Sequence, residues 1–213
     1  MTTFASARPA AARNNFGARE FLRTVALVLA LSLSSLAAPP SALDRQHLIA
    51  HFEMTESWLA DEVSHLSPAQ LKFRPKPASW SVLDCVEHLV LAEPEYWAMF
   101  QHAMAERASR KESPSEDIDR MWYGIDRTEK ATTSASETPK ARFSEIAPPL
   151  AQFRSLRATM LTYVKSSQED WRHHLITGWD RDAYQWLLMI SAHSQRHILQ
   201  IREIKHDANF PVN

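Results

Sequence analysis

Two histidines near the end of the sequence have a spacing that suggests chemistry. His193 and His197 lie four residues apart in a segment whose apolar residues recur at helical intervals. On a helix this spacing places both imidazoles on one face, which here is the apolar face. A buried neutral imidazole needs a partner for each ring nitrogen, and a divalent metal ion is a common partner. The pair therefore predicts a metal site, provided that another part of the chain supplies a third ligand.

His88 is the candidate for that third ligand. It lies in a second predicted helix, on the side that it shares with Cys85 and Ala92, so it borders the core. Three imidazoles with one or two open positions suit zinc, nickel or iron, and such a site lowers the pKa of a bound water or thiol. The alternative that stays open is three buried histidines that bond to side chains or water without any metal.

Two residues near His88 have chemistry of their own. Glu95 follows two turns later and is a weak candidate for a general base, although a boundary glutamate with its carboxylate in solvent is the simpler interpretation. Cys85 precedes His88 by one turn and has the chemistry of a fourth ligand. A small buried hydrophobic residue is the more common role for such a cysteine.

Three residues flank the predicted site. Gln200, one turn beyond His197, has the reach to orient a ligand or a bound water. We interpret Trp80 and Trp186 as core anchors rather than as surfaces for a substrate.

A second pair with four-residue spacing, His47 and His51, is a rival metal site. Each histidine comes one position before a residue of the apolar stripe, so the pair lies roughly 100° from the centre of the buried face. We therefore expect both side chains at the boundary or on the surface.

The elements that must position these residues are helical. Apolar residues recur at three and four positions, and only 3 glycines are present, which indicates an all-α protein. Short, long and short connections would place the second helix beside the fourth in a bundle core. The expected helices are Leu43–Leu66, a helix opening at Ser81, Ile146–Ser167, and one capped by Asp182 that ends near His206.

The long connection spans about residues 109–144, where helical periodicity fails. It contains the apolar and aromatic stretch Met121–Ile125 between polar flanks. Two interpretations stay open: a functional lid or covering loop, or a disordered crossover whose aromatic residues plug the end of the bundle.

Composition excludes several classes of function. The chain has 213 residues, enough for one domain with a sizeable core, and its net charge is −1 without a basic run. Electrostatic binding of nucleic acids requires clustered lysine and arginine, so we expect no nucleic-acid partner. The single cysteine excludes an intrachain disulfide and any site built from several cysteines. Most ligands of any metal must therefore be His, Asp or Glu.

The first 37 residues are typical of a secretory signal. Four arginines precede the apolar stretch Thr24–Leu36, and small residues follow near Ala37. At about 1.5 Å per residue this stretch spans roughly 20 Å, short of a hydrocarbon core of about 30 Å. We expect cleavage near Ala37, export of a single domain of residues 38–213, and no stable membrane span. The alternatives are an uncleaved anchor and a cytoplasmic protein with a misassigned start.

Two segments resemble the DinB-like (DinB/YfiT-like) superfamily. Trp80–Leu89 is similar to its W-S-x-x-x-x-x-x-H-L segment, and Asp182–Ile201 to its last helix with an H-x-x-x-H pair. The resemblance implies an antiparallel four-helix bundle with a long crossover between helices two and three, often dimeric. It also implies a divalent metal on three histidines, which are His88, His193 and His197 here.

The resemblance is less specific for the reaction. Relatives include transferases and isomerases that use bacillithiol, mycothiol or glutathione-like thiols, and others are metal-dependent hydrolases, all acting on small molecules. Such thiols are cytoplasmic, so an export signal favours hydrolysis over thiol transfer. A non-catalytic exported bundle that binds a metal or small ligand is the alternative function.

Overall fold

A computed structural model describes residues 38–109 and 113–212; the predicted signal in residues 1–37 lies outside this part. The described residues form helices, with an isolated bridge between Leu175 and Asp182, which confirms the all-α prediction. No helix among these residues has the length and apolar character to cross a membrane. The helices are α2 (Ala42–Val63), α3 (Pro68–Lys72), α4 (Val82–Ala105), α5 (Asp117–Ile125), α6 (Ala147–Ser166) and α7 (Ala183–Lys205).

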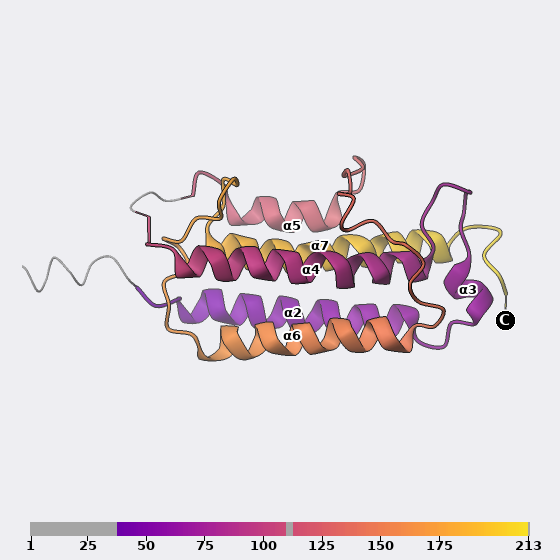
Figure 1. The fold of residues 1–213 in the computed structure, drawn as a ribbon, viewed down its shortest axis with the longest axis horizontal. Coiled ribbons are helices and arrows are strands. Elements are labelled where there is room, and N and C mark those ends of the chain that lie inside the picture. Colours follow the sequence, from indigo (N-terminus) through magenta and orange to yellow (C-terminus); the bar gives the residue numbers. More distant parts are fainter. Residues whose placement is uncertain (1–37, 110–112, 213) are drawn as a thin grey trace, which may run out of the picture. The chain divides into compact units, whose positions relative to one another are not determined.

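Four long helices, α2, α4, α6 and α7, form the predicted bundle (Figure 1). Helix α7 packs against α2 and α4, and α6 packs against the same two helices. In Figure 1, α2 and α7 run in one direction and α4 and α6 in the other, because the crossover carries the chain back along the bundle before α6 begins. The helices that carry His88 and the His193/His197 pair are therefore neighbours, as predicted.

The crossover differs from a simple loop, because it contains helix α5. This helix packs on the outer side of α7. A methyl group at Gly124 would lie 2.9 Å from the Ala192 carbonyl oxygen, so the glycine permits a very close approach of the two helices. Helix α5 depends on this packing, since an isolated segment of nine residues is too short to hold a helix in water.

Side-chain caps fix where the two site-bearing helices begin. Ser81 accepts a hydrogen bond from the Asp84 N–H, while the Asp84 carboxylate accepts from the Ser81 N–H at 2.7 Å. Asp182 and Gln185 make the equivalent reciprocal pair at the start of α7. Such capping boxes satisfy N–H groups that the first turn leaves unpaired, and they fix each helix start in the sequence.

The core consists of two apolar clusters separated by a polar layer. One cluster gathers around Phe52, Phe100 and Trp186, and the other around Leu59, Val86 and Ile201. Along the sequence of each long helix, buried polar residues fall between the residues of one cluster and those of the other. They are Thr55 on α2, Glu93 on α4, Arg157 on α6, and Ser191, His193 and Ser194 on α7. The candidate site therefore adjoins this polar layer.

Candidate metal centre

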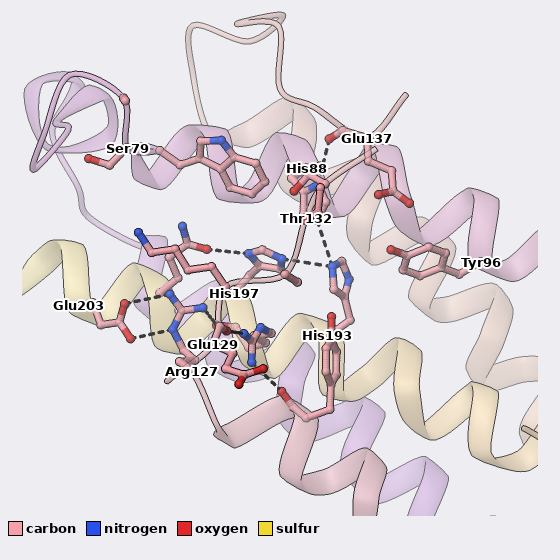
Figure 2. Close-up of a pocket in the computed structure, with 18 residues that line it drawn as sticks. Ser79, His88, Tyr96, Arg127, Glu129, Thr132, Glu137, His193, His197 and Glu203 are labelled. Atoms are coloured by element: carbon pink, nitrogen blue, oxygen red, sulfur yellow. Dashed lines mark hydrogen bonds and ion pairs between the residues drawn. The ribbon is translucent and has the colours of Figure 1, made fainter. Parts of the chain in front are cut away.

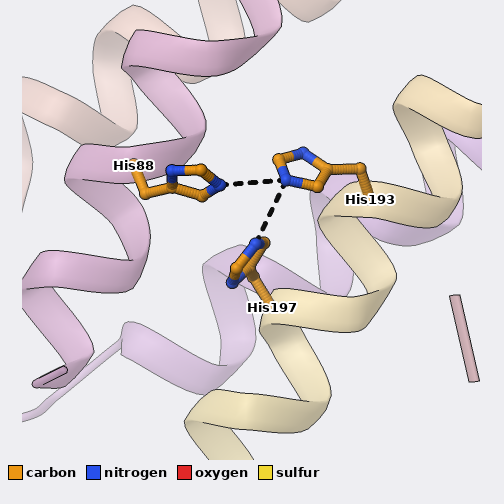
Figure 3. A group of neighbouring side chains, drawn as sticks. All are labelled: His88, His193 and His197. Carbon is orange, nitrogen blue, oxygen red and sulfur yellow. Dashed lines mark hydrogen bonds between the residues drawn. The ribbon is translucent and has the colours of Figure 1, made fainter. Parts of the chain in front are cut away.

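Three histidines from two helices converge on one point (Figure 3). His88 comes from α4, while His193 and His197 come from successive turns of α7. The Nε2 atom of His193 lies 3.0 Å from Nε2 of His88 and 3.1 Å from Nε2 of His197. One ligand atom from each residue lies within 4.8 Å of the others, and all three side chains are buried. The structure thus brings together the three residues that the sequence singled out.

Hydrogen bonds on the far side of two rings set their tautomers. His88 Nδ1 lies 2.9 Å from the carbonyl oxygen of Glu137, and His197 Nδ1 lies 2.9 Å from Oε1 of Gln200. Both partners are acceptors, so each Nδ1 carries the proton and donates it. The Nε2 atom of each ring is then left with a lone pair directed at the common point, as in histidines that bind metals.

This arrangement fits a divalent cation better than it fits three bare imidazoles. Without a cation, His193 has one proton to offer to two facing acceptors, His88 Nε2 and His197 Nε2. With or without an ion, its own Nδ1 is buried and has no hydrogen-bond partner in the described structure. Two nitrogens at about 2.0–2.1 Å from one zinc ion are at most about 4.2 Å apart, so separations of 3.0 and 3.1 Å suit a shared ion.

Burial also keeps the three rings in the form that binds metals. It lowers the pKa of His88 and lowers those of His193 and His197 well below the ordinary value, and the neighbouring imidazoles lower the last two further. A charged imidazole has no lone pair to offer, whereas a neutral one does. At neutral pH all three rings are therefore available as ligands.

A cavity of about 400 Å³ opens over the histidines (Figure 2). Trp80 forms one wall, with its ring 5.7 Å from that of His197 and 4.9 Å from that of His88. Tyr96 forms another wall beside His193, and Figure 2 shows the Glu137 side chain turned toward the Tyr96 hydroxyl. Burial and the nearby negative charge of Glu137 raise the pKa of Tyr96, so its phenol stays protonated.

The crossover forms a further part of the cavity wall. It contributes Tyr123, Arg127, Glu129, Lys130, Ala131, Thr132, Thr133 and Glu137. Arg196 of α7 holds this segment by donating to the carbonyl oxygens of Tyr123, Asp126 and Glu129. Arg127 forms a two-bonded ion pair with Glu203 at 2.6 and 2.9 Å. Of the two interpretations of residues 109–144, this structure agrees with a covering segment over a site.

The other predicted residues lie in different surroundings. Glu95 is exposed, accepts a hydrogen bond from Ser136 at 3.3 Å, and is not among the residues that line the cavity. Cys85 is fully buried in an apolar cluster and is not part of the three-histidine group. Burial raises its pKa far above the ordinary value, so it is a protonated thiol. Gln200 contacts His197, as its spacing suggested.

Two sequence interpretations need correction. His47 is exposed as expected, but His51 is buried, because α7 supplies Gln195 Oε1 as a partner for its Nε2 at 3.2 Å. Trp186 is a core anchor whose indole N–H donates to the Tyr96 carbonyl oxygen. Trp80 instead covers the histidines and lines the cavity, because it stands just before the start of α4, at the edge of the site.

Sequence reasoning missed Glu137, which reaches the site from the crossover. Its carbonyl oxygen accepts from His88, and its carboxylate faces the Tyr96 hydroxyl (Figure 2). The contact with His88 uses a main-chain atom across 49 residues of sequence, and every residue has such an atom. Its position in a polar stretch therefore gave no signal.

Comparisons with known proteins agree with this fold. Residues 47–201 match the DinB superfamily. A solved structure from Bacillus subtilis, YfiT, aligns with a TM-score of 0.54 at 18% identity, covering 81% of this chain and 91% of YfiT. YfiT is described as a probable metal-dependent hydrolase with an unusual four-helix bundle topology, and at this identity the likeness shows the fold. No curated protein sequence matches the chain.

Proposed function

The chain belongs to the DinB superfamily, and we propose that it is a divalent-metal-dependent hydrolase of a small molecule. The observation that carries the proposal is the convergence of three Nε2 atoms, two of which are fixed as lone-pair donors by hydrogen bonds at Nδ1. The description of YfiT supports the same class of reaction. A cavity of about 400 Å³ has the size of a small-molecule site.

His88, His193 and His197 would hold the ion, and the expected metals are zinc, nickel or iron. A bound divalent cation supplies Lewis-acid chemistry and eases deprotonation of a nucleophile at neutral pH. Glu137 then has the role of proton acceptor, since it lines the cavity and its carboxylate faces the Tyr96 hydroxyl (Figure 2). Trp80 and the crossover exclude water from two sides of the site.

Turnover tests this proposal. Protein loaded with zinc, nickel or iron should hydrolyse members of a panel of chromogenic esters and amides. Both His88→Ala and Glu137→Gln should lose this activity, and only the first should also lose the metal. Equal hydrolysis by wild type and His88→Ala would refute the proposal. Metal binding without turnover on any substrate would instead favour the non-catalytic binding module.

Three further proposals concern the rival reaction, export and the oligomeric state. Transfer of a low-molecular-weight thiol is the rival reaction, and it requires a cytoplasmic location. Export through the first 37 residues favours hydrolysis, because exported proteins do not meet the cytoplasmic thiol pool. A homodimer is expected from the family and is tested by sedimentation of the purified protein.

A further inference from the structure

We propose that Glu87 is a positioning residue that holds the crossover where the Glu137 carbonyl oxygen can fix His88. The inference rests on the proposed metal site and adds a residue that the histidine motif does not contain. Glu87 immediately precedes His88 on α4, and its side chain faces the crossover.

Both carboxylate oxygens of Glu87 bind the main chain of the crossover. Oε1 accepts from the Lys140 N–H at 2.7 Å, and Oε2 accepts from the Arg142 N–H at 3.0 Å. The residue is only 1% exposed, and in residues 38–109 and 113–212 no ion pair to it is present. A buried carboxylate without a cation is costly unless N–H groups replace its hydration. Its negative charge is therefore satisfied by the crossover backbone.

The crossover backbone is shaped to receive this carboxylate. Ala141, between the two donors, has a φ of 54°, in the left-handed region that a residue with a Cβ rarely adopts. This conformation lets the N–H groups on either side of Ala141 face one anion, as in the backbone nests that bind carboxylates and phosphates. An alanine in this conformation is strained and persists where the surroundings hold it.

A short rigid turn links the Glu87 contact to His88. Thr138 donates to the Ser134 carbonyl oxygen at 2.8 Å, and the Glu137 N–H donates to Ser134 Oγ at 3.3 Å. Glu137, whose carbonyl oxygen accepts from His88 Nδ1, thus lies in a hydrogen-bonded turn only three residues before Lys140. Fixing residues 140–142 therefore fixes the acceptor that sets the tautomer of His88.

These contacts connect two adjacent residues of α4, Glu87 and His88, through the crossover. Glu87 holds the crossover, and the crossover holds the ring of the next residue in the orientation for metal binding. Loss of the Glu87 carboxylate should free the Glu137 carbonyl oxygen to move and release His88 Nδ1. The metal affinity should then fall, because groups that orient a metal-binding histidine typically contribute about 10–100-fold.

Zinc affinity tests this role, measured by competition with a chromophoric chelator in the full chain. Glu87→Gln should bind zinc at least about tenfold more weakly than wild type, in the range known for such partners. Lys140→Pro removes one of the two N–H donors without altering α4 and should also weaken zinc binding. This variant replaces Glu87→Gln as the test if Glu87→Gln folds poorly. Glu106→Gln, at an exposed position at the end of the same helix, is the matched control and should bind as wild type does.

The ¹⁵N shifts of the His88 ring provide a second readout in metal-free protein. Wild type should show a protonated Nδ1, and Glu87→Gln should show a mixture of tautomers. If Glu87→Gln matches wild type in zinc affinity and in these shifts, the role of Glu87 is refuted while the metal site stands. If wild type itself binds no zinc, the proposed function fails, and the shifts alone decide the role of Glu87.

Discussion

Replacing Glu93 by glutamine should destabilise the metal-free bundle by about 3–5 kcal/mol, because it leaves Arg157 as a buried charge without its counterion. Arg157 is fully buried, and its Nη2 lies 3.1 and 3.0 Å from the two Glu93 carboxylate oxygens. The same nitrogen donates to Ser194, which also donates to Glu93. These contacts join α4, α6 and α7 at the polar level next to His193.

The size of this destabilisation depends on the interactions that the Arg157 guanidinium would keep in Glu93→Gln. Its Nε and Nη1 already have no hydrogen-bond partner within the described chain. The rings of Phe52 and Phe153, 4.5 and 4.9 Å from its centre, contribute about 1–2 kcal/mol of cation–π stabilisation each. The Glu93 carboxylate is therefore the main compensation for burying the charge. Domains of this size lose about 2–4 °C in Tm per kcal/mol, so Tm should fall by roughly 6–20 °C.

Urea and thermal unfolding of metal-free protein measure this effect in a double-mutant cycle. Glu93→Gln and Arg157→Met should each be strongly destabilising. The double variant Glu93→Gln/Arg157→Met removes both charges and should cost less than the sum of the single changes. Glu53→Gln breaks an exposed pair with Lys165 and should cost about 0–1 kcal/mol as the control. A cost for Glu93→Gln within about 1 kcal/mol of this control, or strict additivity, would refute the reasoning.

Three further outcomes are expected. Metal-free protein should lose stability as pH falls from about 7 toward about 5, because burial lowers the pKa values of His51 and of the three site histidines below the ordinary 6.5 and the unfolded chain then takes up protons first. Thermal unfolding across this range should show a weaker pH dependence for His51→Gln, and an unchanged dependence would contradict the cause. Gly124→Ala should lower Tm despite a helix-propensity gain of about 1 kcal/mol, because its Cβ would lie 2.9 Å from the Ala192 carbonyl oxygen; a higher Tm would disprove the close packing of α5. Mass spectrometry of the exported protein should find a start near Ala38, whereas an intact N-terminus would contradict cleavage.

The sequence was sufficient for the four long helices and for the convergence of the three histidines, because local rules govern both. The four-residue spacing of His193 and His197 places them on one face of any helix, and the capping residues Ser81 and Asp182 mark where the two helices begin. Connection lengths then place these helices side by side. Each step depends on neighbours within a few residues, or on the order of the elements.

The surroundings of the histidines depend on contacts that local rules do not encode. Helix α5 forms where Gly124 packs on α7, and His51 is buried because Gln195 faces it from another helix. Glu137 contacts His88 through a carbonyl oxygen that has no sequence signature. The sequence therefore offered a covering segment as one of two interpretations, but it did not indicate which residue of that segment contacts His88.

The metal content of the purified protein tests the central claim most directly. After zinc loading and removal of free metal, wild type should retain one ion per chain. His102→Ala, which changes an exposed histidine, should retain the same amount, and His193→Ala should retain none. One ion per chain in His193→Ala, or no ion in wild type, would contradict a metal centre on His88, His193 and His197.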